Sequence, residues 1–156
     1  MSVFKNKTFQ IILSFLIIFF VATLGSIFVN IGMSFFNSLT KPSQWINNAL
    51  IPIVWTIIYG LFAIINFFWI KNDQIPLKIV VLMLINGFLN ILWCLVFFTL
   101  KLLFLGNIVI ILNLIFGYIL VLQIFKSKRL YGFLLSVYPI WLSIATTLNL
   151  ALWILN

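Results

Sequence analysis

Long apolar runs alternate with short polar breaks along this chain. The runs cover roughly residues 9–34, 48–70, 77–100, 102–125 and 130–155. Each run exceeds the roughly 20 residues that a helix needs to cross the hydrocarbon core of a bilayer. The runs are continuous and lack the alternation of a membrane β-barrel, whereas a helix satisfies its own backbone groups in lipid. The pattern therefore predicts an all-α membrane protein, a five-transmembrane-helix bundle that forms a single domain over residues 1–156.

The composition agrees with a membrane protein and excludes most enzyme chemistry. Hydrophobic residues make up 65% of the chain and charged residues 6%, whereas about a quarter of an average soluble domain is charged. The chain has no histidine, one cysteine, Cys94, and one acidic residue, Asp73. Catalytic triads, carboxylate pairs, metal cages and carboxylate proton relays therefore lack their side chains. We expect no metal site and no required cofactor.

The basic residues predict how the bundle is oriented. If the predicted helices cross in order, one side holds Lys5, Lys7, Lys71, Lys78, Lys126, Lys128 and Arg129, and the other side holds Lys41 and Lys101. Cytoplasmic loops carry an excess of Lys and Arg, so we expect the N-terminus in the cytoplasm, with the 37–47 loop and Asn156 outside. The first run is longer than the apolar part of a signal peptide and has no clear cleavage site, so we expect a retained helix.

The basic residues also bear on partners and on the membrane. They lie in separate short breaks and form no continuous patch, so the net charge of +8 does not indicate a nucleic-acid surface. We predict the lipid bilayer as a partner and no nucleic acid. The low charge and the lack of a targeting sequence favour a bacterial inner (plasma) membrane, with an organellar membrane as the alternative.

The tryptophans fall into two groups by depth. Trp45, Trp69 and Trp153 lie near the ends of the predicted spans, where tryptophan is typical of an interface anchor. At a rise of 1.5 Å per residue, Trp55 lies roughly 10 Å inside its span, and Trp93 and Trp141 lie roughly 15 Å or more inside theirs. A deep indole N–H needs an acceptor, which indicates an internal polar site.

Three spans each carry aromatic and amide side chains at helical spacing. These stripes are Trp55, Tyr59, Ala63 and Asn66; Asn86, Asn90, Trp93 and Phe97; and Trp141, Ala145, Asn149 and Leu152. An amide that faced lipid would cost free energy, so we expect the three faces to converge. Two interpretations stay open. The amides form hydrogen bonds between helices, or they line a cavity with aromatic walls that receives a flat, largely apolar molecule.

Several short motifs resemble one membrane-protein family. Residues 41–43, Lys-Pro-Ser, with 54–56, Val-Trp-Thr, and Tyr59 resemble the "KPSW…PVWTxLY" signature of the TspO/MBR family. These are the tryptophan-rich sensory proteins, related to the mitochondrial translocator protein or peripheral benzodiazepine receptor. Residues 89–93 are similar to the family's "LNxxW", and residues 138–156 are similar to its "PYxxWxxxAxxLNxxxWxLN". The loop at 43–47 departs from the usual "SWxPP".

The resemblance implies a fold, a ligand class and a set of site residues. The family fold is a five-helix bundle, commonly a homodimer, with a pocket that is lidded by the loop after the first helix. The family binds porphyrins and other tetrapyrroles, and some members bind cholesterol or benzodiazepine-type ligands. Carried over by motif, the ligand-binding residues are Trp55, Tyr59, Asn90, Trp93, Trp141, Ala145 and Asn149, and the lid residues are Phe36, Lys41, Pro42 and Ser43.

Three functions follow as hypotheses. The first is an integral membrane binding protein for porphyrin-like planar ligands, acting in sensing, sequestration or transport. Without histidine, iron would need Tyr, Met or Cys, which favours a metal-free porphyrin. The alternative is a light-dependent, protoporphyrin-degrading enzyme, as reported for some relatives, with Trp55 and Trp141 as candidate catalytic residues. The third is a structural bundle that binds no ligand.

Overall fold

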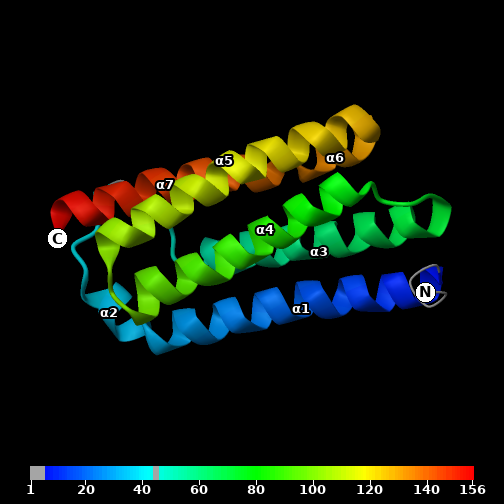
Figure 1. Cartoon of the computed structure of the whole chain (residues 1–156). Helices are drawn as coiled ribbons and strands as arrows, with labels where there is room; N and C mark the ends of the chain where they lie inside the picture. The colour runs from blue at the N-terminus through cyan, green and yellow to red at the C-terminus, as the bar shows by residue number, and fades with distance from the viewer. Residues whose placement is uncertain (1–5, 44–45) are drawn as a thin grey trace.

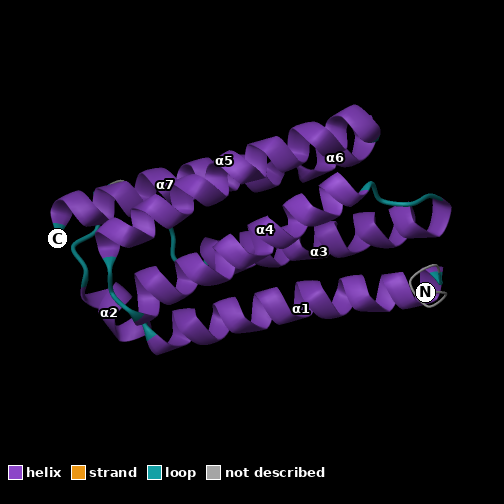
Figure 2. Ribbon diagram, viewed as in Figure 1, coloured by secondary structure: helices purple, strands orange, loops and turns teal. Residues whose placement is uncertain are grey.

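The computed structural model describes residues 6–43 and 46–156, and all its regular elements are helices (Figures 1 and 2). Five long apolar segments can cross a membrane, and they confirm the predicted five-helix bundle. In chain order the elements are α1 (Lys7–Ile31), α2 (Met33–Ser38), α3 (Leu50–Asn72), α4 (Leu77–Cys94) with its π-helical continuation (Leu95–Thr99), α5 (Leu103–Ser127), α6 (Arg129–Leu135) and α7 (Val137–Leu155).

The long helices form a ring around a central space. Helix α1 packs against α3 and α4, and α5 packs against α4 and α7. Helix α3 closes the ring through its contacts with α6 and α7. Although α3 and α4 are consecutive, they hardly touch, and in Figure 1 they lie between α1 on one side and α5 and α7 on the other.

The first long helix ends earlier than the predicted 9–34 run because the chain meets another helix. Gly32 is buried and caps α1. A Cβ at this position would collide with the backbone of Phe98, so only glycine allows the approach. Beside this contact, the hydroxyl of Thr99 donates a 3.0 Å hydrogen bond to the carbonyl oxygen of Phe28. The chain then turns into α2, which lies at the end of the bundle (Figure 1). Phe36 on this helix is buried.

The connection between the third and fourth spans is short because the helix changes its pitch. Residues Leu95–Thr99 are π-helical, and the N–H of Leu100 donates to the carbonyl of Leu95 at 2.9 Å. Lys101 follows with φ of 59°, in the left-handed region, which reverses the chain. The π-helical segment buries Phe97 and Phe98. These rings come to lie at the wall of the central space.

The fifth span is broken, although its sequence predicted one continuous run over 130–155. Helix α6 ends at Leu135, and α7 begins at Val137. Pro139 lacks an N–H, and its ring crowds the carbonyl of the residue four positions earlier, which ends an ordinary helical ladder. Gly132 lies against the backbone of Phe125, which allows the tight turn between α5 and α6.

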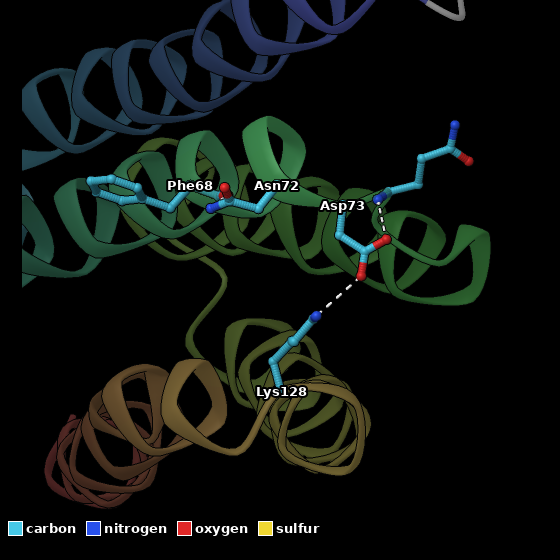
Figure 3. A network of polar contacts seen from close by, with 5 residues as sticks. Phe68, Asn72, Asp73 and Lys128 are labelled. Carbon is cyan, nitrogen blue, oxygen red and sulfur yellow. Dashed lines mark hydrogen bonds and ion pairs between the residues drawn. The ribbon is translucent and has the colours of Figure 1, made fainter.

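Polar contacts tie the loops together at each end of the bundle. At one end, Lys7 Nζ donates to the carbonyl of Lys71 at 3.0 Å. There too Lys128 Nζ lies 3.0 Å from the Asp73 carboxylate, which also accepts the N–H of Gln74 at 2.8 Å (Figure 3). These contacts bring the start of α1, the 71–78 segment and the 126–129 loop to one end of the bundle.

At the other end, Asn156 joins the loop that follows α2. Its side-chain oxygen accepts the N–H of Thr40 at 2.8 Å, and its side-chain nitrogen donates to the carbonyl of Thr40 at 3.0 Å. The two groups of basic residues are thus separated as the predicted topology requires, except that Lys5 lies outside the described residues. Which end faces the cytoplasm stays a prediction.

The prediction that Trp69 is an interface anchor is wrong. Trp69 is only 1% exposed, because α6 covers this end of α3, and its ring lies 5.4 Å from that of Tyr131. Trp153 is 42% exposed on the outer surface, where its ring lies 5.4 Å from that of Phe104. Trp45 lies outside the described residues. The place of Trp69 near a span end therefore did not predict its burial, because the helix that covers it, α6, is distant in the sequence.

Candidate functional site

A cavity of about 540 Å³ occupies the half of the ring next to α2. Such a volume suits a drug-sized ligand. Its wall combines side chains from α1, α2, α3, α4 with its π-helical continuation, and α7. The structure brings all the predicted ligand-binding residues to this wall: Trp55, Tyr59, Asn90, Trp93, Trp141, Ala145 and Asn149. Their role toward a ligand stays a prediction.

Only one of the four predicted lid residues lines the cavity. Phe36 lines the cavity, whereas Lys41, Pro42 and Ser43 lie in the loop beyond it. Lys41 Nζ donates to the carbonyl of Phe36 at 3.0 Å and lies 4.8 Å from the centre of its ring. The ammonium therefore holds the C-terminal end of α2, as a cation at a helix C-terminus does.

Aromatic rings in contact form one wall of the cavity. The ring of Trp55 stacks on that of Tyr59 at 5.7 Å and lies 6.5 Å from that of Trp93. The ring of Trp93 lies 6.0 Å from that of Phe97 and 5.6 Å from that of Phe98. These separations are typical of favourable aromatic pairs. The wall is continuous from α3 to the π-helical segment and offers a large apolar surface.

Both amides among the predicted ligand-binding residues form hydrogen bonds between helices. Asn149 accepts the indole N–H of Trp93 at 3.2 Å and donates its own N–H to the amide oxygen of Asn107 at 2.7 Å. Asn90 donates to the hydroxyl of Tyr59 at 2.7 Å. These contacts join α4, α5 and α7, and α3 to α4. Both the oxygen and the nitrogen of the Asn149 amide therefore form hydrogen bonds between helices, as the first of the two interpretations predicts.

Two polar atoms at the wall remain without such partners. The indole nitrogen of Trp141 and the amide oxygen of Asn90 are buried, and neither finds a hydrogen-bond partner among the described residues. Buried donors and acceptors in folded proteins are nearly always satisfied. Both side chains line the cavity, and each has one buried polar atom without a partner among the described residues.

Sequence reasoning missed part of the wall. Ser26, Asn30 and Cys94 also line the cavity, although none of them is among the predicted site residues. Ser26 and Asn30 are one helical turn apart on α1, so they share a face. That spacing was the signal available in the sequence, whereas nothing around Cys94 distinguished a wall position from an interior one.

The fold and the site define the class of protein: an integral membrane protein with five candidate spans, four of which line an internal cavity. The TspO/MBR family model matches residues 14–154, and the chain belongs to the TspO/MBR family. The resemblance carried by the motifs in the first loop and in the second, third and fifth spans is thereby confirmed. A search of the curated proteins finds no match.

Proposed function

We propose that the protein binds a porphyrin-like planar molecule in the cavity beside α2, and that this binding serves sensing, sequestration or transport. The observation that carries the proposal is the buried indole N–H of Trp141, which finds no acceptor among the described residues and belongs to a side chain that lines an aromatic cavity. A polar edge of a ligand, such as a carbonyl or a propionate, supplies that acceptor. The family membership supports the same ligand class.

The rest of the wall suits the plane of such a ligand. The aromatic surface from Trp55 to Phe98 buries the apolar face of a macrocycle, and burial of apolar area is the main favourable term in binding. The amide oxygen of Asn90 is buried without a partner among the described residues, and in this proposal it accepts a donor such as a pyrrole N–H. Lys41, at the end of α2, is the cation of the adjoining loop and suits a propionate at the entrance. A metal-free porphyrin needs no ligand from the protein.

Replacing the indole of Trp141 by a phenyl ring tests the proposal. Trp141→Phe keeps an aromatic ring but loses the donor, so we expect protoporphyrin affinity to fall roughly fivefold, the usual worth of one hydrogen bond. Affinity is measured from the change in porphyrin absorbance on titration with purified protein in detergent. Trp153→Phe is the matched control, because it removes an exposed indole that does not line the cavity. Equal affinities in both variants would contradict the proposed role of Trp141.

A light-dependent activity is the second candidate, and one observation favours it. Both candidate catalytic residues, Trp55 and Trp141, line the same cavity as the proposed pigment. Oxidative loss of protoporphyrin in light would use dioxygen as the oxidant and an electron-rich indole beside the pigment. If the protein is an enzyme, illuminated pigment loses its absorbance with the wild type but not with Trp55→Phe or Trp141→Phe. Unchanged pigment with the wild type leaves binding alone.

A further inference from the structure

A second cavity, of about 640 Å³, occupies the other half of the ring between α1, α3 and α4. It exists because α3 and α4 hardly touch, and α1 covers the gap between them. Gln74 and Leu77, which are exposed, line its outer end. The second cavity therefore opens at the end of the bundle that carries Lys71 and Lys128, opposite to α2.

The two cavities meet at a common partition. Trp55, Tyr59 and Asn90 line both of them, and the 2.7 Å hydrogen bond between Asn90 and Tyr59 lies in this partition. On α4, the second cavity reaches from Leu77 to Asn90, which is about 20 Å at 1.5 Å per residue. The space is thus long and ends at a polar group.

The second cavity has a polar group that the first lacks. Asn66 is 6% exposed and lines the cavity, where its amide nitrogen donates to the hydroxyl of Ser14 at 2.9 Å. Its amide oxygen is buried and finds no donor among the described residues. Asn90, at the inner end, has the same unmet acceptor. The charged side chains of the described residues do not line this cavity.

We propose that the second cavity is a binding site for a neutral, elongated, apolar molecule whose hydroxyl group donates a hydrogen bond to the amide oxygen of Asn66. Unmet acceptors call for a donor on the ligand. A carboxylate would bring further acceptors into a cavity whose described wall offers no cation, so its desolvation would oppose binding. This site differs in ligand and in entrance from the one proposed beside α2.

Three retinoids with the same polyene test the ligand chemistry. Retinol is neutral and has a hydroxyl donor, retinyl acetate lacks the donor, and retinoate is charged at pH 7. We expect saturable equilibrium binding of tritiated retinol to the purified full chain, with retinyl acetate and retinoate at least roughly fivefold weaker. Equal, non-saturable uptake of all three would show partition into detergent and overturn the proposal.

Two substitutions across one hydrogen bond test the role of Asn66. Asn66→Leu removes the acceptor, so we expect retinol affinity to fall to that of retinyl acetate while protoporphyrin affinity is unchanged. Ser14→Ala is the matched control, because it removes the same contact between α1 and α3 but keeps the amide oxygen. An equal loss of retinol binding in both variants would assign the effect to helix packing and contradict the proposed contact.

Filling each cavity separately locates the bound retinol. Val80→Trp, or Met83→Trp if the first variant does not fold, places an indole in the second cavity, and Ala145→Phe fills the cavity beside α2. We expect retinol binding to be lost only when the second cavity is filled. Loss only in Ala145→Phe would overturn the proposal. Retinol binding without protoporphyrin binding would refute the proposed function alone, and the reverse would refute this inference alone.

Discussion

Buried amides hold this bundle together at the level of single residues. Asn149 satisfies the indole N–H of Trp93 on one side and the amide oxygen of Asn107 on the other. Tyr138 places its hydroxyl 3.2 Å from the amide oxygens of both Asn86 and Asn113. Polar contacts of this kind are individually modest in a membrane. Their value here is that each one fixes the relative rotation of helices that line a cavity.

The central position of Asn149 gives the first stability prediction. Asn149→Leu leaves the Trp93 indole N–H and the Asn107 amide oxygen unpaired, whereas Asn107→Leu removes only one contact. Since a buried unpaired group costs about 1–3 kcal/mol, we expect Asn149→Leu to lower the free energy of unfolding more than Asn107→Leu. Denaturant titration in detergent measures both. Equal losses would show that the Trp93 contact contributes nothing.

At the scale of elements, the close approach of α1 to the π-helical segment is the tightest constraint. A Cβ at Gly32 collides with the backbone of Phe98, so Gly32→Ala forces the helices apart. We expect this variant to lose roughly 1–3 kcal/mol of stability, the usual cost of overpacking. The measurement is the melting temperature in detergent.

Gly60 is the matched control for Gly32. A Cβ there meets nothing within 4 Å, and the residue lies inside α3. Alanine favours a helix over glycine by about 1 kcal/mol, so Gly60→Ala should raise the melting temperature. If Gly32→Ala melted at the same temperature as Gly60→Ala, the close approach of the two helices would be refuted.

The ion pair between Asp73 and Lys128, at the end of the bundle that holds most of the basic residues, predicts that the stability of the fold depends on pH. The hydrogen bond from Lys128 is the main cause that holds the pKa of Asp73 below its usual range, and the N–H of Gln74 adds to it. A lowered pKa in the folded protein stabilises the fold above the unfolded pKa of about 4. This contribution is lost as the pH falls below that value. It is small because the pair is exposed.

Asp73→Asn isolates this effect, because Asp73 is the only acidic side chain in the sequence. We expect the melting temperature of the wild type to fall slightly as the pH is lowered below 5. It then approaches the melting temperature of the variant, which changes less with pH. Thermal melts at matched ionic strength provide the measurement. Parallel pH profiles for the two proteins would contradict the contact between Asp73 and Lys128.

The elements show what the sequence could and could not predict. The spans were predicted to within a few residues, because a continuous apolar run and a polar break are local properties. The break at Ser136 and the π-helical turn at Leu95–Thr99 were missed, because a run of apolar residues does not indicate where a helix is interrupted or changes its pitch. The burial of Trp69 was missed because it depends on the packing of α6 over α3.

The candidate site was predictable for a similar reason. Helical spacing places Trp55 and Tyr59 on one face, and the same rule holds for Asn90 with Trp93 and for Trp141 with Ala145 and Asn149. Spacing also put Asn66 and Asn86 on these faces, but it does not say that the central space is divided. The second cavity therefore had no sequence signal of its own. Lys41 was assigned to a lid by motif, and its contact with Phe36 is visible only in three dimensions.

At the scale of the whole molecule, the two ends of the bundle differ in charge. The end with Lys7, Lys71 and Lys128 holds most of the basic residues, and the end with α2 holds Lys41 and Lys101. We therefore propose a cytoplasmic N-terminus in a bacterial inner membrane. A homodimer, which the family resemblance implies, is part of the same proposal.

A reporter fused after Asn156 tests the orientation. Five spans place the two ends of the chain on opposite sides of the membrane, so alkaline phosphatase at this position should be active outside the cytoplasm. The control is the same reporter fused within the 126–129 loop, which should be inactive. The reverse pattern of activity would overturn the argument from charge, although it would leave the bundle unchanged.

Quenching of tryptophan fluorescence by protoporphyrin shows whether the cavity beside α2 binds a planar ligand. Ala145→Phe fills the cavity, whereas Ala63→Phe makes the same change on α3 at a position that lines neither cavity. We predict saturable quenching in the wild type and in Ala63→Phe, and only linear quenching in Ala145→Phe. Linear quenching in all three proteins, or equal saturation in all three, would contradict ligand binding in the cavity beside α2.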